Sequence, residues 1–151
     1  MKARLTLLAI CVAALTPAAC GDDDSASPEE FRSQASEVCL DVERQLDEIQ
    51  ETLPATAEQA EKQAEAVADV SDQALSNLRQ VDAPGELQGA YDRYLAEREQ
   101  AIGFIEDARD AANAKDSDAY EAAKRKLADG QPARRQLALR LDLGSCSRPS
   151  R

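Results

Sequence analysis

Residues 27–53, SPEEFRSQASEVCLDVERQLDEIQETL, open with Ser27-Pro28-Glu29-Glu30 and then carry an apolar residue at every third or fourth position. A serine followed by proline and, three residues later, by glutamate is the capping box of a helix start. The apolar positions that share one helical face are Phe31, Ala35, Val38, Val42, Leu46, Ile49 and Leu53. This spacing predicts an amphipathic helix that stops before Pro54.

Two further helices follow from the same kinds of signal. Thr56-Ala57-Glu58-Gln59 is a second capping box, and small or apolar residues continue at helical spacing to Val81. The segment Asp82-Ala83-Pro84-Gly85 is typical of a turn. A third apolar stripe then runs from Leu87 to Ala112, so we expect a third helix there.

A fourth helix is predicted after a loop at residues 113–117. Asp118 is the expected cap, the apolar stripe extends from Tyr120 to Leu141, and Gly144 is placed to terminate the helix. Gly130 and Pro132 lie inside this stripe, and we expect them to kink or break the helix.

Helices of similar length joined by short loops favour an all-α fold with up-down-up-down topology. No alternating strand pattern is present, and aromatic residues make up 3% of the chain. We therefore expect one four-helix bundle over residues 29–146.

The first residues predict export. Lys2 and Arg4 precede an uncharged run from Leu5 to Leu15, followed by the small residues Ala18 and Ala19. This order is typical of a signal peptide, expected here as residues 1–19. The apolar run is shorter than the roughly 20 residues that a transmembrane helix needs.

Ala18-Ala19-Cys20, followed by Gly21-Asp22-Asp23-Asp24, resembles the lipobox of bacterial lipoproteins. The resemblance implies that Cys20 receives a diacylglyceryl group, whose acyl chains, such as palmitate, anchor the protein in the membrane outside the cytoplasm. Pro17 stands where the lipobox usually has leucine or valine. Residues 20–28 would then form the lipidated cysteine and an acidic tether. The alternative is an ordinary secreted protein in which Cys20 is a free thiol.

Two cysteines remain in the expected domain, Cys39 and Cys146. In an oxidising compartment they are expected to form a disulfide. The first and last helices of an up-down-up-down bundle bring these positions to the same end, which agrees with that pairing. No metal or cofactor is expected, since the chain has no histidine and two thiolates do not complete a zinc site.

The charge distribution is uneven. The chain carries a net charge of −11, yet residues 120–151 hold eight basic and three acidic side chains. One interpretation is that this basic end neutralises the neighbouring acidic helices. The other is contact with anionic lipid headgroups by four arginines, Arg135, Arg140, Arg148 and Arg151, the last two lying in a basic tail at residues 147–151. Nucleic acid is disfavoured as a partner because the chain as a whole is negatively charged and lacks an aromatic stacking platform.

Arg98 and Arg134 fall on the apolar stripes of adjacent antiparallel helices, at similar distances from the loop that joins them. Their side chains are expected to reach solvent; alternatively they pair with Glu97 or Glu99, or bind an anion together beside Tyr94. The anion site, Arg98, Arg134 and Tyr94, is the one candidate binding site. We expect no catalytic residues, because serine nucleophiles would lack a histidine base and the bundle enzymes with carboxylate-histidine metal sites need histidine.

Several positions give the mature chain a family likeness: Phe31, Ala35 and Cys39, then Pro84, Tyr91, Tyr94 and Leu95, and finally residues 141–146, LDLGSC. Together they resemble the small, alanine-rich, cysteine-paired helical lipoproteins of high-GC bacteria, which implies the fold and no specific activity. The leading expectation is a structural or interaction module at the membrane that contacts an unidentified envelope protein. The alternative is a bundle that binds a small or lipid-like ligand in a thin alanine-rich core.

Overall fold

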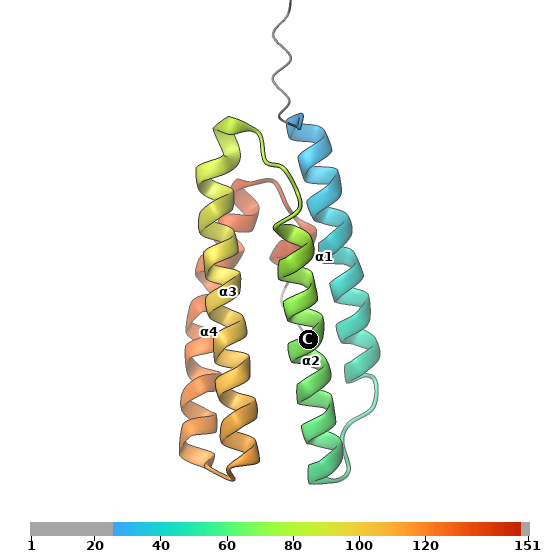
Figure 1. Ribbon diagram of the computed structural model, residues 1–151, viewed down its shortest axis with the longest axis vertical. Helices are drawn as coiled ribbons and strands as arrows, with labels where there is room; N and C mark the ends of the chain where they lie inside the picture. The colour runs from blue at the N-terminus through green and yellow to red at the C-terminus, as the bar shows by residue number, and fades with distance from the viewer. Residues whose placement is uncertain (1–25, 149–151) are drawn as a thin grey trace, which may run out of the picture.

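The computed structural model describes residues 26–148, and all regular secondary structure in that range is helical. The elements are α1 (Pro28–Gln50), α2 (Ala57–Leu78), α3 (Gly85–Asn113), α4 (Ser117–Arg140) and the short 3₁₀ helix η1 (Ser145–Ser147). Successive helices run in opposite directions, so the predicted up-down-up-down four-helix bundle is confirmed (Figure 1).

Both capping boxes begin helices where the sequence predicts. The Glu30 amide donates to Oγ of Ser27 at 3.2 Å, and Pro28 occupies the first turn, where its missing N–H costs nothing. The Gln59 amide donates to Oγ1 of Thr56 at 3.2 Å. Each side chain satisfies a backbone donor that has no partner inside its helix.

Two termini of the fourth helix differ from the prediction. Its cap is Asp116, which accepts from the Ala119 amide at 3.0 Å, and not Asp118. The helix ends before Gly144, because Asp142 adopts a left-handed conformation with φ of 60°. The Leu143 amide then donates to the Ala138 carbonyl at 2.9 Å. This is a Schellman ending, in which an aspartate takes the position that glycine usually fills.

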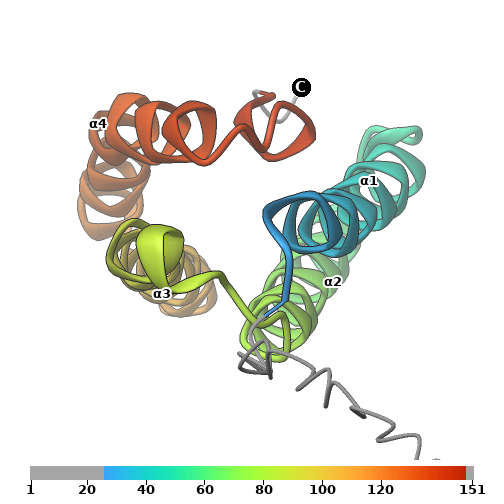
Figure 2. The same ribbon diagram turned by 90° about the horizontal axis from the view of Figure 1, so that it is seen from above.

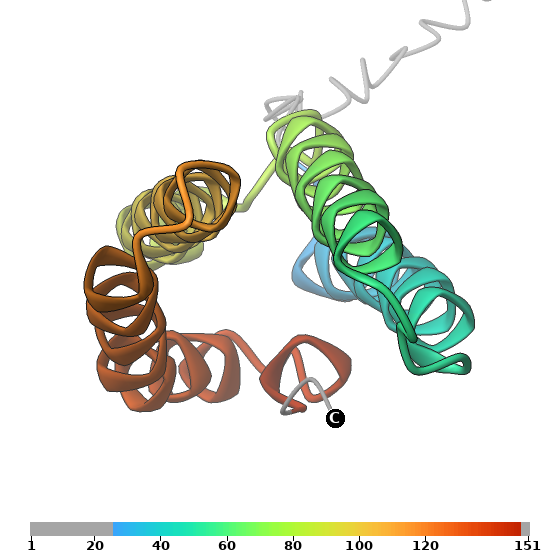
Figure 3. The same cartoon turned by 90° about the horizontal axis from the view of Figure 1, so that it is seen from below.

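Helix α4 is unbroken through Gly130 and Pro132. Pro132 has no N–H to donate to the carbonyl of the preceding turn, and its ring crowds that carbonyl. Figure 3 shows the consequence, since the axis of α4 changes direction between its brown first part and its red second part. Of the two outcomes expected near Gly130 and Pro132, the structure therefore shows the kink.

The main core lies at the end of the bundle where α1 begins. Phe31 and Tyr91 meet edge to face with centroids 4.9 Å apart, and Tyr91 and Tyr94 stack at 6.3 Å. The Tyr91 hydroxyl donates to the Leu78 carbonyl at 2.6 Å, which ties α3 to the last residue of α2. The buried residues of this cluster are Phe31, Ala35, Cys39, Leu78, Val81, Ala83, Tyr91, Tyr94, Ala138, Leu141 and Leu143.

The opposite half of the bundle is thinly packed. Leu53 and Tyr120, both expected on apolar stripes, are 86% and 37% exposed. Leu53 lies beyond the end of α1 in the connection to α2, and Tyr120 lies in the first turn of α4 at the far end. Few large side chains are available to fill this half, and the small residues Ala68, Ala101 and Ala123 are buried instead.

The predicted disulfide between Cys39 and Cys146 is present, with Cα atoms 5.1 Å apart. After α4 the chain turns back, and η1 contacts both α4 and α1 (Figure 2). Helices α1 and α4 hardly touch one another directly. The bundle is therefore closed on this side by η1 and its disulfide.

Candidate functional site

A cavity of about 530 Å³ lies within the bundle, beside the disulfide. All four helices and the segment around η1 contribute to its wall. Its apolar lining comes mainly from β-branched and leucine side chains of different helices: Val42, Leu46, Val67, Ile102, Ile105 and Leu127. A volume of this size lies within the range of small-molecule pockets, roughly 300–1,000 Å³.

The cavity forms because the middle of the bundle is poor in large side chains. Ala101 and Ser71 are buried on α3 and α2 and line it. The Ser71 hydroxyl donates to the Val67 carbonyl one turn earlier at 2.7 Å, so this donor needs no partner inside the cavity. Figures 2 and 3 show η1 between α1 and α4, on the side where these two helices are far apart.

The charges around the cavity are divided between its walls. Helices α3 and α4 supply four cations, Arg98, Lys124, Arg134 and Arg135, whereas α1 supplies the carboxylates Glu43 and Asp47. Arg148 from the C-terminal segment binds Glu43 at 2.7 Å and so neutralises one of these carboxylates. In a chain with a net charge of −11, the α3 and α4 wall is a local concentration of positive charge.

Arg98 and Arg134 both line this wall, as their sequence positions predict. The guanidinium of Arg134 is only partly exposed to solvent. Its Nη2 donates to the Leu127 carbonyl at 2.7 Å, and its Nη1 is buried without a hydrogen-bond partner. Burial lowers the pKa of Arg134, and the nearby charge of Arg98 lowers it further. Glu97 acts in the opposite direction but forms no ion pair with Arg134 within residues 26–148.

The other pairing considered from the sequence does not form either. Glu99 binds Arg79 of the α2 terminus at 2.8 Å. Across the part of the chain that the structure describes, neither Arg98 nor Arg134 forms an ion pair with a carboxylate. The two arginines are therefore close, partly desolvated and without a counter-ion among those residues.

Tyr94 is not part of the cavity wall. Its side chain is fully buried, and its hydroxyl lies 4.0 Å from Sγ of Cys39. Burial raises the pKa of Tyr94, while Arg98 and Arg134 oppose that shift. Arg98 and Arg134 are thus near enough to Tyr94 to affect its pKa, but Tyr94 is buried in the core and does not line the cavity.

The residues expected at the membrane are found in different places. Cys20 and Arg151 lie outside the described residues. Arg140 is exposed at the last turn of α4, whereas Arg135 and Arg148 border the cavity. Among residues 26–148, no helix has a long enough apolar stretch to cross a bilayer.

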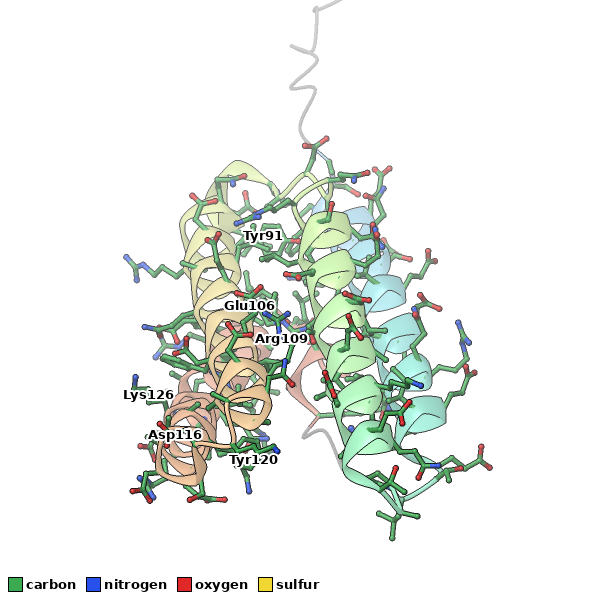
Figure 4. The ribbon with its side chains drawn as sticks, turned by 60° about the horizontal axis from the view of Figure 1, so that its bottom comes forward. Tyr91, Glu106, Arg109, Asp116, Tyr120 and Lys126 are labelled. Carbon is green, nitrogen blue, oxygen red and sulfur yellow. A yellow bond between two sulfur atoms is a disulfide. The ribbon has the colours of Figure 1, made fainter. Side chains whose placement is uncertain are left out.

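Other clusters of charge are solvated or internally paired. A shallower hollow of about 890 Å³ lies along α1 and is lined largely by charged side chains, among which Arg44 binds Asp41 and Glu48. Figure 4 shows Glu106 and Arg109 on α3 toward α2, and Arg109 binds the neighbouring Asp110 at 2.9 Å. Within the described range, no group of three or more potential metal ligands gathers.

Comparison of the chain with protein-family models, with curated proteins and with solved structures found no match. The site therefore rests on its own geometry. Sequence reasoning found Arg98 and Arg134 from their place on apolar stripes but missed Lys124 and Arg135 as their companions. The run of cations in α4 was a usable signal, since helical spacing places Lys124, Leu127 and Arg134 toward one side.

Proposed function

We propose that this protein is an exported, lipid-anchored binding protein that holds a small, largely apolar ligand in the cavity between its helices. The cavity carries the proposal, because it is a concavity in which apolar side chains of all four helices meet a set of polar and charged groups. The alternative expected from the sequence is thereby favoured over the structural module. We propose no catalytic role.

The anchor is supported by the sequence of residues 1–24, in which a signal peptide precedes Cys20 and an acidic stretch. An acidic, small-residue tether of this length keeps the domain close to the membrane surface. Helix α1 starts directly after the tether, at the end of the bundle that holds the aromatic core (Figure 1). The thinly packed half with the exposed Tyr120 is then directed away from the membrane.

The deciding experiment is native mass spectrometry of the protein extracted in detergent from the membranes of the cells that produce it. A diacylglyceryl adduct on Cys20 and a co-purifying small molecule would support both parts of the proposal. A Cys20→Ala variant should lose the adduct and leave the membrane fraction. Protein that carries no adduct and retains nothing, even at low collision energy, would contradict both parts.

Occupancy of the cavity is tested separately by filling it. Ala101→Leu adds a side chain at a buried position that lines the cavity, while Ala96→Leu makes the same change on the exposed face of α3. The first variant should release the co-purifying molecule and the second should retain it. Should Ala101→Leu fold poorly, judged by its melting temperature, Ser71→Leu on α2 provides the same test from the opposite wall.

A structural or interaction role has one observation in its favour. Leu40 and Leu53 are 47% and 86% exposed and border the hollow along α1. A contiguous apolar patch marks a protein contact, whereas single exposed apolar side chains are common on any protein surface. Cross-linking through a cysteine introduced at Glu51, between these leucines, would give one stoichiometric adduct with an envelope protein if α1 is such a surface.

A further inference from the structure

If the cavity holds a ligand, as proposed above, two observations indicate the chemical class of that ligand. The first is the pair of arginines from adjacent helices that line the same wall, Arg98 and Arg134, without an ion pair in the described chain. Like charges that are close and partly desolvated repel one another and lose hydration. An anion between them would remove both penalties.

The second observation is the unused donor on Arg134. Its Nη1 is buried without a partner, although buried polar atoms are nearly always hydrogen-bonded. The side chain is held in this position by the bond from Nη2 to the Leu127 carbonyl and by the space above Gly130. A small rotation of the guanidinium toward the cavity would present Nη1 to a ligand, where a paired anion would satisfy it.

The walls from α1 and α2 add apolar surface to the cavity, beside the polar residues Glu43, Asp47, Gln50 and Ser71. Opposite the arginines lie Val42 and Leu46 of α1 and Val67 of α2. These side chains offer no polar partner, and burying an apolar chain against them is favourable by about 25 cal/mol per Å². The positive wall and the apolar wall therefore fit the two ends of one amphiphile.

We propose that the cavity binds a single-chain amphiphile with one anionic head group, a carboxylate or phosphate, held between Arg98 and Arg134, with its alkyl chain along Val42, Leu46, Val67 and Ile102. Lys124 and Arg135 at the same wall attract the anion before it docks. Arg148 neutralises Glu43, so that Asp47 is the one cavity-lining carboxylate of α1 without an ion pair among the described residues.

The test uses the full chain in nanodiscs of phosphatidylcholine, which carries no net charge, with empty nanodiscs to subtract partition of the probe into lipid. Radiolabelled laurate, dodecyl phosphate and dodecanol are bound in turn, and inorganic phosphate serves as the anion without a chain. We expect laurate or dodecyl phosphate to bind at least tenfold more tightly than dodecanol. Whichever head group binds more tightly identifies the source of the anion.

Variants assign the head group to the two arginines. Arg98→Gln and Arg134→Gln should each weaken binding of the charged amphiphile about tenfold or more, since each removes a charge-assisted hydrogen bond. Neither should change the affinity for dodecanol. Arg93→Gln and Arg125→Gln remove the same charge from exposed positions of α3 and α4 and should leave both affinities unchanged.

The outcomes separate this inference from the proposed function. Equal binding of dodecanol and laurate, abolished by Ala101→Leu, would overturn the anionic head group and leave the cavity ligand intact. Inorganic phosphate that binds as tightly as dodecyl phosphate would overturn the amphiphile and leave a plain anion site. Failure of every alkyl probe, together with insensitivity of any retained molecule to Ala101→Leu, would overturn the proposed function itself.

Discussion

Nη1 of Arg134 lies where the side chain of residue 130 would begin, since a Cβ built on Gly130 would stand 2.5 Å from this nitrogen. Glycine inside a helix lowers stability by about 1 kcal/mol relative to alanine. The absence of a side chain at Gly130 therefore leaves room for the end of Arg134 in the ligand-free protein, at a cost in helix stability.

Gly130→Ala should raise the free energy of unfolding by up to about 1 kcal/mol, because the flexible end of Arg134 can move aside. The same displacement moves Nη1 out of the space above Gly130, as ligand binding does, and should tighten binding of the anionic amphiphile. Urea unfolding and radiolabelled laurate binding measure the two effects. Gly89→Ala is the control, since an added Cβ there meets nothing within 4 Å; it should stabilise the protein and leave binding unchanged. Parallel behaviour of the two variants would contradict the role assigned to Gly130.

Arg134→Met should raise the free energy of unfolding of the ligand-free protein by about 1 kcal/mol. The change removes a buried donor without a partner and the repulsion from Arg98, at the cost of one hydrogen bond to the Leu127 carbonyl. Arg135→Met, at the exposed neighbouring position, should change the free energy of unfolding by less than about 0.5 kcal/mol. A loss of 2 kcal/mol or more in Arg134→Met would make Arg134 a structural residue.

Tyr91→Phe should lower the free energy of unfolding by about 1 kcal/mol, because the hydroxyl bond to the Leu78 carbonyl is lost. The carbonyl also accepts from the Val81 amide at 3.1 Å, which keeps the cost moderate. Tyr120→Phe at the far end should have almost no effect. Equal losses in the two variants, measured by urea unfolding, would mean that the Tyr91 hydroxyl stabilises nothing.

Stability should fall at alkaline pH through Tyr91 and Tyr94. Burial raises the pKa of both phenols above the ordinary value of 10.0. Above pH 10 the unfolded chain loses these protons while the folded chain keeps them, so the free energy of unfolding decreases by up to about 1.4 kcal/mol per pH unit for each group. The double change of Tyr91 and Tyr94 to Phe should flatten this decline. A slope that survives in that variant would assign it to other groups.

Reduction of the Cys39–Cys146 disulfide should cost up to about 4.7 kcal/mol in the chain-entropy estimate for a loop of this length. It should also release the segment around η1 from α1, so that the cavity loses a wall. We expect laurate binding to fall in Cys39→Ala/Cys146→Ala even at temperatures where circular dichroism shows an intact bundle. Unchanged affinity in the folded, reduced protein would separate the disulfide from the site.

Local signals in the sequence predicted the helices well, because Ser27 and Thr56 act within one turn and depend on no tertiary contact. The predicted end of α4 was wrong. Glycine usually takes the left-handed position at a helix end, which pointed to Gly144, but Asp142 takes it here. Which residue takes the left-handed position depends on where the chain must turn to bury Leu143. The aromatic core determines that point.

Periodicity also predicted the apolar faces but not how fully each is buried. Leu53 continues the stripe of α1, yet it lies past the helix end, where no neighbour covers it. The meeting of Arg98 and Arg134 at one wall was predictable because arginines on an apolar stripe are unusual. The cavity was expected only as an alternative, from the thin alanine-rich core, because its size depends on how far apart the helices lie.

The covalent ring from Cys39 to Cys146 also determines what one proteolytic cut can do. All three connections between the long helices, residues 51–56, 79–84 and 114–116, lie inside this ring. A protease that cleaves any one of them leaves both fragments joined through the two sulfurs and, with Cys20 acylated, both still attached to the membrane. If Cys20 is acylated as proposed, a nicked molecule would be retained at the membrane, and its fragments would separate only after reduction.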